Sequence, residues 1–352
     1  MKKLRIGMIG AGNIAKAHLD AYKNVPDAEI VAVCDINREN LDEVADLYNI
    51  PNRYDSVEEM LAGCELDAAD VCVWNCNHAK CSIAALNAGL HVLCEKPMAY
   101  NAQEAEDMKK AAEANGKLLM IGFVLRFSSG ERVAKDFIDN GYLGDIYHTK
   151  ATYLRRHGAP GGWFCKKELA GGGPVIDLGV HVIDLTRYLM GNPNPVSVYA
   201  VTNSSMGNRP YLKTNVGWMP KGASDSDPYE VEDIGTAIIR YDNGATTLLE
   251  TSYNMNGENT TKKEFFGTKG GIKVDENGMK IFTVINDYLA DVTPQINNLK
   301  KGGDLFVEEM KHFVDCALNG TECIAKAEDG ITVMRILDAI YESAETGHEV
   351  IL

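Results

Sequence analysis

The chain has 352 residues, of which 45% are hydrophobic and 24% charged. This length exceeds what one hydrophobic core usually serves, so we expect a globular protein of two domains. The 50 acidic residues outnumber the 35 basic ones and give a formal charge of −15. Because an acidic body repels nucleic acid and anionic membrane surfaces, neither is expected as a partner.

The first residues and the cysteines both predict a cytoplasmic protein. The start at Met1 could open a signal peptide, but Arg5, Gly7 and Gly10 interrupt the apolar segment. The apolar run Leu118–Leu125 is much shorter than the ~18 residues of a membrane span. The nine cysteines lack the spacing of a disulfide framework, so we expect free thiols in a reducing compartment.

One cluster of possible metal ligands comprises Cys72, Cys76, His78 and Cys81. No paired C-x-x-C motif occurs there, and a strand followed by a strand-to-helix turn would scatter the four side chains. We therefore expect no metal site.

The chain opens with the pattern of a dinucleotide-binding unit. A strand expected over Leu4–Ile9 runs into Gly10-Ala11-Gly12-Asn13-Ile14-Ala15, and a helix follows. In this arrangement Gly10 makes the tight turn, and Gly12 lets a pyrophosphate approach the backbone. The helix start at Asn13 and Ile14 directs its N–H groups at the phosphates. These four residues are candidate cofactor contacts.

Asp35 is the acid expected to hold the adenosine ribose. It ends a second strand over Ile30–Asp35 and lies twenty residues past Ala15. Its carboxylate would accept hydrogen bonds from the ribose hydroxyls and repel a 2′-phosphate, which favours NAD as the cofactor. Arg38 nearby is also a candidate cofactor contact and keeps NADP possible.

Helices and strands then alternate as far as residue 124. We expect helices over Asn40–Tyr48, Val57–Ala62, Ala79–Ala88 and Ala102–Asn115, and strands over Ala69–Trp74, His91–Cys94 and Leu118–Gly122. Repeated βα units at short spacing indicate a doubly wound parallel sheet, which makes residues 1–124 a dinucleotide-binding domain.

Ligands of such sheets bind beyond the carboxyl ends of the strands, and two polar segments fall there. Asn75 and His78 follow one strand; His78 either caps the next helix or lines the nicotinamide pocket. Glu95 and Lys96 follow the next strand. The Lys96 ammonium either points into the cleft, where Glu95 can modulate it, or forms a surface salt bridge. All four residues are candidate cofactor contacts.

After Leu125 the alternation stops, and residues 125–352 are expected to form a second domain with an antiparallel sheet. Its strands are expected over Gly144–Leu154, Val196–Thr202, Ile234–Tyr241, Thr246–Tyr253, Lys262–Gly267, Gly271–Val274 and Lys280–Thr283. Its helices are expected over Ser128–Asn140, Asp304–Asn319 and Asp329–Thr346. The polar loop Ser204–Glu232 is long enough to be functional.

A glycine turn and the helix after it carry the candidate catalytic groups of this domain. Gly171-Gly172-Gly173 lets the backbone turn sharply, and a helix is expected over residues 174–190. Asp177, His181 and Asp184 are spaced by four and three residues, so all three are expected on one face. A carboxylate beside an imidazole suits proton transfer. The alternative is a capped helix with a solvated polar face.

Two further side chains are candidate substrate contacts. Arg126 lies at the junction of the two domains, where an interdomain ligand could meet it. Trp163 precedes the glycine turn, and an aromatic face packs on the C–H bonds of a sugar ring. Ordinary packing is the alternative for Trp163.

With these motifs in view, the chain resembles the Gfo/Idh/MocA family, which includes glucose–fructose oxidoreductase and inositol dehydrogenases. The matching motifs are Gly10-Ala-Gly12-Asn-Ile-Ala15, Glu95-Lys96-Pro97 and Gly171-Gly-Gly-x-x-x-Asp177-x-Gly179-x-His181-x-x-Asp184, and the similarity covers essentially the whole chain. The resemblance implies a Rossmann domain followed by an α/β domain with an open, mostly antiparallel sheet, usually as a homodimer or homotetramer. The chain departs from the family at Trp74-Asn75-Cys76, where a Thr-Pro pair is usual.

The resemblance further implies NAD(P)-dependent hydride transfer at a secondary alcohol of a sugar, glycoside or cyclitol. Lys96, Asp177 and His181 would be the catalytic group and would contact the substrate. His181, oriented by Asp177, would take the hydroxyl proton, and Lys96 would stabilise the negative charge on the oxygen. The alternatives are a redox-neutral glycosidase of the same family, which keeps NAD bound, and a non-catalytic NAD-binding regulator.

Overall fold

The structure is a computed structural model that describes residues 3–207, 209, 212, 219–221, 223–224, 226–295 and 304–352. Part of the expected loop Ser204–Glu232 lies outside the described residues. The described residues form two compact units: those up to 124 together with 304–334, and those of 125–295 together with 335–352. The sequence-based division placed all of 125–352 in the second domain, so the assignment of residues 304–334 is corrected.

Residues 304–334 join the first unit because their apolar face completes its core. The ring of Phe306, in helix α9 (Leu305–Asn319), packs at 5.6 Å from the ring of His18. Further along, the backbone N–H of Ile121 donates to the Ala325 carbonyl at 3.0 Å. The apolar pattern of a helix shows which face is buried, but it does not show which sheet covers that face.

The first unit is built on a six-stranded parallel sheet in the order β3-β2-β1-β4-β5-β6. Its strands are β1 (Leu4–Ile9), β2 (Ala28–Cys34), β3 (Asn52–Tyr54), β4 (Ala68–Val71), β5 (His91–Glu95) and β6 (Leu119–Gly122). The predicted doubly wound parallel sheet is confirmed. The edge strand β3 was not predicted, because its three half-buried residues carry no apolar pattern.

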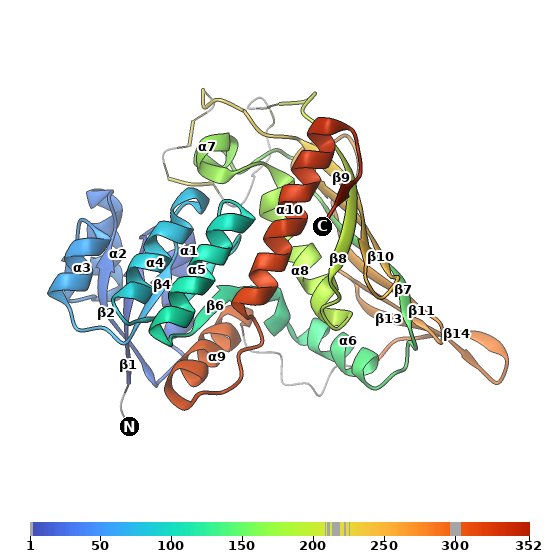
Figure 1. Cartoon of the computed structure of the whole chain (residues 1–352), viewed down its shortest axis with the longest axis horizontal. Coiled ribbons are helices and arrows are strands. Elements are labelled where there is room, and N and C mark those ends of the chain that lie inside the picture. The colour runs from blue at the N-terminus through green and yellow to red at the C-terminus, as the bar shows by residue number, and fades with distance from the viewer. Residues whose placement is uncertain are drawn as a thin grey trace. The chain divides into compact units, whose positions relative to one another are not determined.

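Helices follow the strands as the alternation predicts (Figure 1). They are α1 (Asn13–Tyr22), α2 (Arg38–Tyr48), α3 (Val57–Gly63), α4 (His78–Asn87) and α5 (Ala102–Asn115). Side chains of Asn37, Ser56 and Asn101 accept hydrogen bonds from backbone N–H groups in the first turns of α2, α3 and α5. Helix α1 packs against α9, and α4 packs against α5. Among the described helices, none is long and apolar enough to cross a membrane.

The strand order reverses direction between β1 and β4. The chain runs outward from β1 through β2 to β3, and then returns to lay β4 on the other side of β1. In open α/β sheets, ligands bind at the carboxyl ends of the strands at such a switch point. The glycine loop after β1, the segment 73–78 after β4 and Lys96 after β5 all lie at this edge of the sheet.

The second unit contains a nine-stranded sheet in the order β14-β13-β12-β11-β7-β10-β9-β8-β15. Its strands are β7 (Ile146–Leu154), β8 (Pro195–Asn203), β9 (Ile234–Tyr241), β10 (Thr246–Ser252), β11 (Thr260–Gly267), β12 (Gly271–Asp275), β13 (Gly278–Ile285), β14 (Tyr288–Val292) and β15 (Val350–Ile351). Strand β7 pairs antiparallel with β11 but parallel with β10, while the other pairs are antiparallel. The predicted mostly antiparallel sheet is confirmed.

Helices cover one face of this sheet. Helix α6 (Ser129–Asp139) packs on β12 and β13, and α8 (Val180–Leu189) packs on β7. The core between them contains Ala134, Leu143, Leu185, Leu189, Phe265, Ile272, Val274, Met279 and Ile281. Because side chains alternate along a strand, their neighbours point to the opposite face, where Tyr199, Ile238 and Phe282 are exposed. Helix α10 (Ala327–Thr346) contributes residues to both units.

Candidate functional site

The glycine loop after β1 leaves the start of helix α1 open. A Cβ added at Gly10, where φ is +100°, would lie 2.3 Å from the Cys72 carbonyl oxygen, so the turn requires glycine. A Cβ added at Gly12 would meet no atom within 4 Å. Gly12 caps α1 and makes no side-chain hydrogen bond to the first turn of the helix, where backbone N–H groups lack intrahelical partners. This arrangement fits the pyrophosphate of a dinucleotide.

Asp35 connects the end of β2 to the glycine loop. One carboxylate oxygen accepts the backbone N–H of Ala11 at 2.7 Å, and the other accepts that of Asn37 at 2.7 Å. The side chain of Arg38 is exposed and pairs with Asp42 at 3.0 Å and with Asp55 at 3.1 Å. Two acids therefore already partner the guanidinium that could have received a 2′-phosphate.

His78 joins the segments that follow β4 and β5. Its Nδ1 lies 2.6 Å from the Pro97 carbonyl oxygen and its Nε2 lies 3.1 Å from that of Val73. A helix cap must accept hydrogen bonds from N–H groups, so the proposed capping role of His78 is wrong. Burial lowers the pKa of this imidazole, although the two carbonyl groups oppose the shift.

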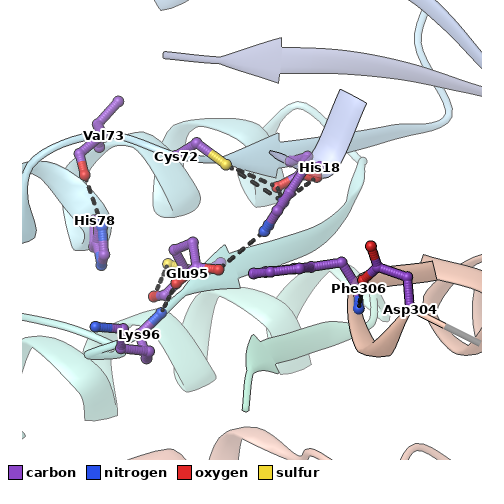
Figure 2. A network of polar contacts seen from close by, with 10 residues as sticks. His18, Cys72, Val73, His78, Glu95, Lys96, Asp304 and Phe306 are labelled. Carbon is purple, nitrogen blue, oxygen red and sulfur yellow. Dashed lines mark hydrogen bonds and ion pairs between the residues drawn. The ribbon is translucent and has the colours of Figure 1, made fainter. Parts of the chain in front are cut away.

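The same unit contains a buried polar network that the sequence did not predict (Figure 2). His18 on α1 lies between two carboxylates: Nδ1 is 2.9 Å from Asp70 Oδ2, and Nε2 is 3.0 Å from Glu95 Oε1. Cys72 Sγ adds contacts of 3.4 Å to Asp70 and 3.5 Å to His18. His18 and Asp70 are fully buried, and Glu95 is 5% exposed.

Burial and charge set the protonation of this network. Burial alone would lower the pKa of His18, but the Asp70 carboxylate outweighs it and raises that pKa well above its usual value. Glu309 on α9 is also fully buried, and neither of its oxygens has a hydrogen-bond partner among the described residues. Burial, reinforced by the negative charges of Glu95 and Asp70, raises the pKa of Glu309 well above its usual value. These surroundings therefore favour the protonated forms of both His18 and Glu309.

Lys96 is half-buried, and its backbone N–H donates to Glu95 Oε2 at 3.0 Å. Figure 2 shows the Lys96 side chain extending towards the side on which His78 lies, whereas the Glu95 carboxylate turns towards His18. The positive charge of Lys96 accordingly contributes to the low pKa of His78.

In the second unit, the glycine turn is built on a carboxylate from a distant loop. Glu232 accepts the backbone N–H groups of Gly173 at 2.9 Å and Val175 at 3.0 Å, and the hydroxyl of Tyr341 at 3.0 Å. A Cβ at Gly172 would lie 2.0 Å from the Tyr341 hydroxyl, and one at Gly173 would lie 2.5 Å from the Glu232 carbonyl oxygen. Both positions therefore require glycine.

The helix after this turn differs from the regular helix predicted over 174–190. Its first part, Val175–Gly179, is one π-helical turn, and α8 begins at Val180. Such turns frequently occur at functional sites, and they change the spacing of side chains along the helix face. Asp177 lies inside the π turn, and His181 is the half-buried second residue of α8.

The Asp177 carboxylate, 9% exposed, is held by groups that the sequence did not predict. The hydroxyl of Tyr253, at the end of β10, donates to Asp177 Oδ2 at 2.8 Å. Burial, together with the Asp177 charge, raises the pKa of Tyr253 well above its usual value, so Tyr253 stays a donor. Arg155 lies within electrostatic range of Asp177 and adds a positive charge.

The prediction that Asp184 shares a polar face with Asp177 and His181 is wrong. Asp184 is 1% exposed, and its carboxylate forms a bidentate ion pair with Arg126, including an Nε–Oδ2 distance of 2.9 Å. The Arg126 guanidinium, which is also 1% exposed, lies over the ring of Tyr188 at 4.5 Å. The structure gives Arg126 the carboxylate partner that a buried arginine needs, and its substrate contact stays a prediction.

Trp163 lies in the short helix η3 (Gly162–Cys165) and is half-buried. Its ring stacks on Phe164 with centroids 3.9 Å apart and planes inclined by 26°. The pair forms an aromatic surface, and a sugar contact of Trp163 stays a prediction.

Two groups of possible metal ligands occur within the described residues, and neither is the group weighed from the sequence. They are His18 with Asp70 and Cys72, and His312 with Cys316 and Cys323. The first group is the hydrogen-bonded network described above. In the second, His312 Nε2 already accepts the backbone N–H of Ile324 at 3.0 Å.

Comparison with known proteins identifies the family. A model described as "Oxidoreductase family, NAD-binding Rossmann fold" matches residues 4–123, and one for the "GFO/IDH/MocA C-terminal domain" matches residues 132–273. The chain belongs to the Gfo/Idh/MocA family. It is thus an NAD-binding oxidoreductase, and the predicted family and cofactor are confirmed.

Members of the Gfo/Idh/MocA family resemble the chain along its whole length. D-glucoside 3-dehydrogenase of Escherichia coli is 34% identical over 99% of this chain and 97% of its own. Levoglucosan dehydrogenase of Pseudarthrobacter phenanthrenivorans is 29% identical over 98% and 97%. A solved levoglucosan dehydrogenase in complex with NADH and levoglucosan superposes with a TM-score of 0.87, 26% identity and coverage of 100% and 99%.

The two loop glycines should separate folding from cofactor binding. We expect Gly10→Ala to destabilise the protein by about 1–3 kcal/mol, because a side chain is strained at this backbone conformation. Gly12→Ala should cost only about 1 kcal/mol as a weaker helix cap, yet lower NADH affinity about tenfold or more by filling the space for the pyrophosphate. Thermal unfolding and NADH fluorescence titration measure both effects. A Gly12→Ala protein that binds NADH as tightly as the wild type would contradict this reading of the loop.

Because of the buried Glu309 carboxyl group, we expect the folded protein to become less stable as pH rises. The pKa of this group is raised in the folded state, so the unfolded chain ionises first, near pH 4.3. Between that pH and the folded pKa, the free energy of unfolding should fall by about 1.4 kcal/mol per pH unit. Glu309→Gln cannot ionise, so its stability relative to the wild type should increase between pH 5 and 7.5. Urea unfolding at the two pH values tests this, and a pH-independent difference would contradict a neutral Glu309.

Proposed function

We propose that the chain is an NAD-dependent dehydrogenase that oxidises a secondary hydroxyl of a sugar, with glycosides as the first substrate class. The observation that carries this proposal is the open glycine loop in a chain whose full-length relatives include a glucoside dehydrogenase and a levoglucosan dehydrogenase. A myo-inositol dehydrogenase is a more distant relative at 26% identity, so cyclitols form the second class.

Lys96, Asp177 and His181 are the groups proposed to carry out the chemistry. When bound, NAD accepts the hydride from the substrate carbon. His181 takes the hydroxyl proton, because a neutral imidazole is a base at physiological pH. Lys96 holds the substrate oxygen and stabilises the negative charge that develops on it. Asp177, fixed by Tyr253 and facing the charge of Arg155, favours the cationic form of the histidine after proton transfer.

The acidic surroundings of the ribose position support NAD over NADP. Asp35 presents a carboxylate after β2, and Arg38 is partnered by Asp42 and Asp55. A 2′-phosphate would meet the charge of Asp35 and would have to compete with Asp42 and Asp55 for the Arg38 guanidinium. We therefore propose NAD as the working cofactor, bound by the glycine loop and Asp35.

The direct test is NADH formation by the purified protein with a panel of glucosides, levoglucosan, free aldoses and inositols. Steady NADH accumulation with at least one pyranoside, and slower reduction of NADP, is the expected result. Cleavage of a glycoside without net NADH would instead identify the redox-neutral glycosidase. NAD binding without turnover of any panel member would favour the regulator.

Variants connect the turnover to the proposed residues. His181→Ala and Lys96→Ala should each lower turnover about 100-fold or more, because each removes a group that acts in the transition state. NADH affinity should remain within a few-fold. His148→Asn is the matched control, since this half-buried histidine on β7 bonds the Thr246 side chain and lies on the sheet. Near-normal turnover in both active-site variants would refute the assignment.

The exposed face of the second sheet supports the expected homodimer or homotetramer, which stays a proposal. Tyr199 on β8 and Ile238 on β9 are paired neighbours, 47% and 49% exposed, and large apolar surfaces of this kind mark interaction sites. Light scattering should show an oligomer that Ile238→Asp dissociates. A monomeric wild type would contradict the proposal.

A further inference from the structure

The buried network of the first unit ends at the backbone of the candidate catalytic lysine. Asp70 on β4 contacts Nδ1 of His18, whose Nε2 contacts Oε1 of Glu95. The second oxygen of Glu95 accepts the backbone N–H of Lys96. An unbroken series of hydrogen bonds therefore runs from the interior of one strand to the turn after the next (Figure 2).

When both Asp70 and Glu95 are ionised, this series requires hydrogen-bond donors at both nitrogens of the His18 ring. A neutral imidazole has a single N–H and would turn a lone pair towards one of the two carboxylates. An acceptor facing a buried carboxylate is unfavourable, and His18 is fully buried beneath the ring of Phe306. The imidazolium form satisfies Asp70 and Glu95 together.

Glu309 also lies within electrostatic range of His18. It comes from α9, whereas Asp70 lies in β4, Cys72 directly follows β4 and Glu95 ends β5. Because its oxygens have no hydrogen-bond partner among the described residues, Glu309 does not compete for the two ring N–H groups. Burial, together with the charge of Asp70, raises the pKa of the Tyr22 hydroxyl on α1 well above its usual value, so Tyr22 stays neutral.

The pairing also determines where the Glu95 carboxylate points. Both of its oxygens are occupied, one by His18 and one by the Lys96 backbone. The Lys96 side chain extends in a different direction, towards His78. Without His18, an ionised Glu95 would lose the ring that partners one of its oxygens, and the adjacent residue Lys96 carries a positive charge with which it could pair.

We propose that His18, supported by Asp70, is a positioning residue that holds the Glu95 carboxylate away from the Lys96 ammonium and fixes the backbone of Lys96. The charge of Lys96 then remains directed at the substrate oxygen instead of pairing with Glu95. This proposal rests on the proposed function, in which Lys96 contacts the substrate. His18 itself contacts neither substrate nor cofactor.

The test compares His18→Asn with the double variant His18→Asn/Glu95→Gln. His18→Asn should lower kcat about 10- to 100-fold, because the lysine is displaced from its working position, while the KM for NAD changes within a few-fold. The double variant removes the unpaired carboxylate, so its thermal stability should recover. Its kcat should also recover in part, because an uncharged amide at position 95 cannot form an ion pair with the Lys96 ammonium.

A second readout does not depend on turnover. In the cofactor-free protein, the backbone amide proton of Lys96 should resonate downfield, because it donates to a carboxylate, and it should move upfield in His18→Asn. Two matched controls should leave both kcat and this resonance unchanged. His91→Asn alters a histidine at the other end of β5, and Glu309→Gln replaces a neutral acid by a neutral amide.

Three results would overturn the proposal: normal kcat in a folded His18→Asn protein, a double variant whose kcat stays as low as that of the single variant, or an unmoved Lys96 amide resonance. The first two are measured against the wild type under identical conditions. If the wild type oxidises no sugar, the proposed function is wrong. The Lys96 amide resonance would then be the test of whether His18 positions Lys96.

Discussion

A histidine clamped between two buried carboxylates is the constraint on which the first unit depends. Helix α1, strand β4 and strand β5 each contribute one member: His18, Asp70 and Glu95. Removing one partner of a buried ion pair costs about 3–5 kcal/mol, a large part of the ~5–15 kcal/mol that stabilises a folded domain. The three elements can therefore adopt few other arrangements. The hydrogen bond from the Lys96 backbone N–H to Glu95 also restricts the movement of the segment after β5.

Both units use a carboxylate from a distant segment to hold a glycine-rich backbone in place. Asp35 binds the N–H of Ala11 in the loop that receives the cofactor phosphates, and Glu232 binds those of Gly173 and Val175 in the turn before Asp177. Glycine can adopt the backbone conformation of these turns, but it can adopt many other conformations as well. The hydrogen bonds to the two carboxylates stabilise the turn conformation over the others. Each candidate site segment is thus rigid without a bulky side chain that would exclude a ligand.

The sequence predicted what depends on local pattern and spacing. Short-range periodicity and spacing predicted the βα alternation, the glycine loop and the position of Asp35. They also predicted the mostly antiparallel second sheet. Partners separated by tens of residues could not be paired, which is why Asp184, the partner of Arg126, was read as part of a polar face. A signal for the buried network was present: Asp70 is an acid within an otherwise apolar strand. An isolated acid in such a strand requires a buried cation, although the pattern does not show that the cation is His18.

The ring nitrogens of His18 provide the most direct test of this account. In the folded protein, labelled with ¹⁵N, both ring nitrogens should carry protons at pH 7, and both protons should exchange slowly because the ring is fully buried. Since the folded pKa is raised, the stability from this charge is complete below about pH 6.5 and is lost as pH rises through the folded pKa. Two protonated nitrogens that persist above pH 7 would support the account. A neutral ring with a single N–H at pH 7 would contradict it.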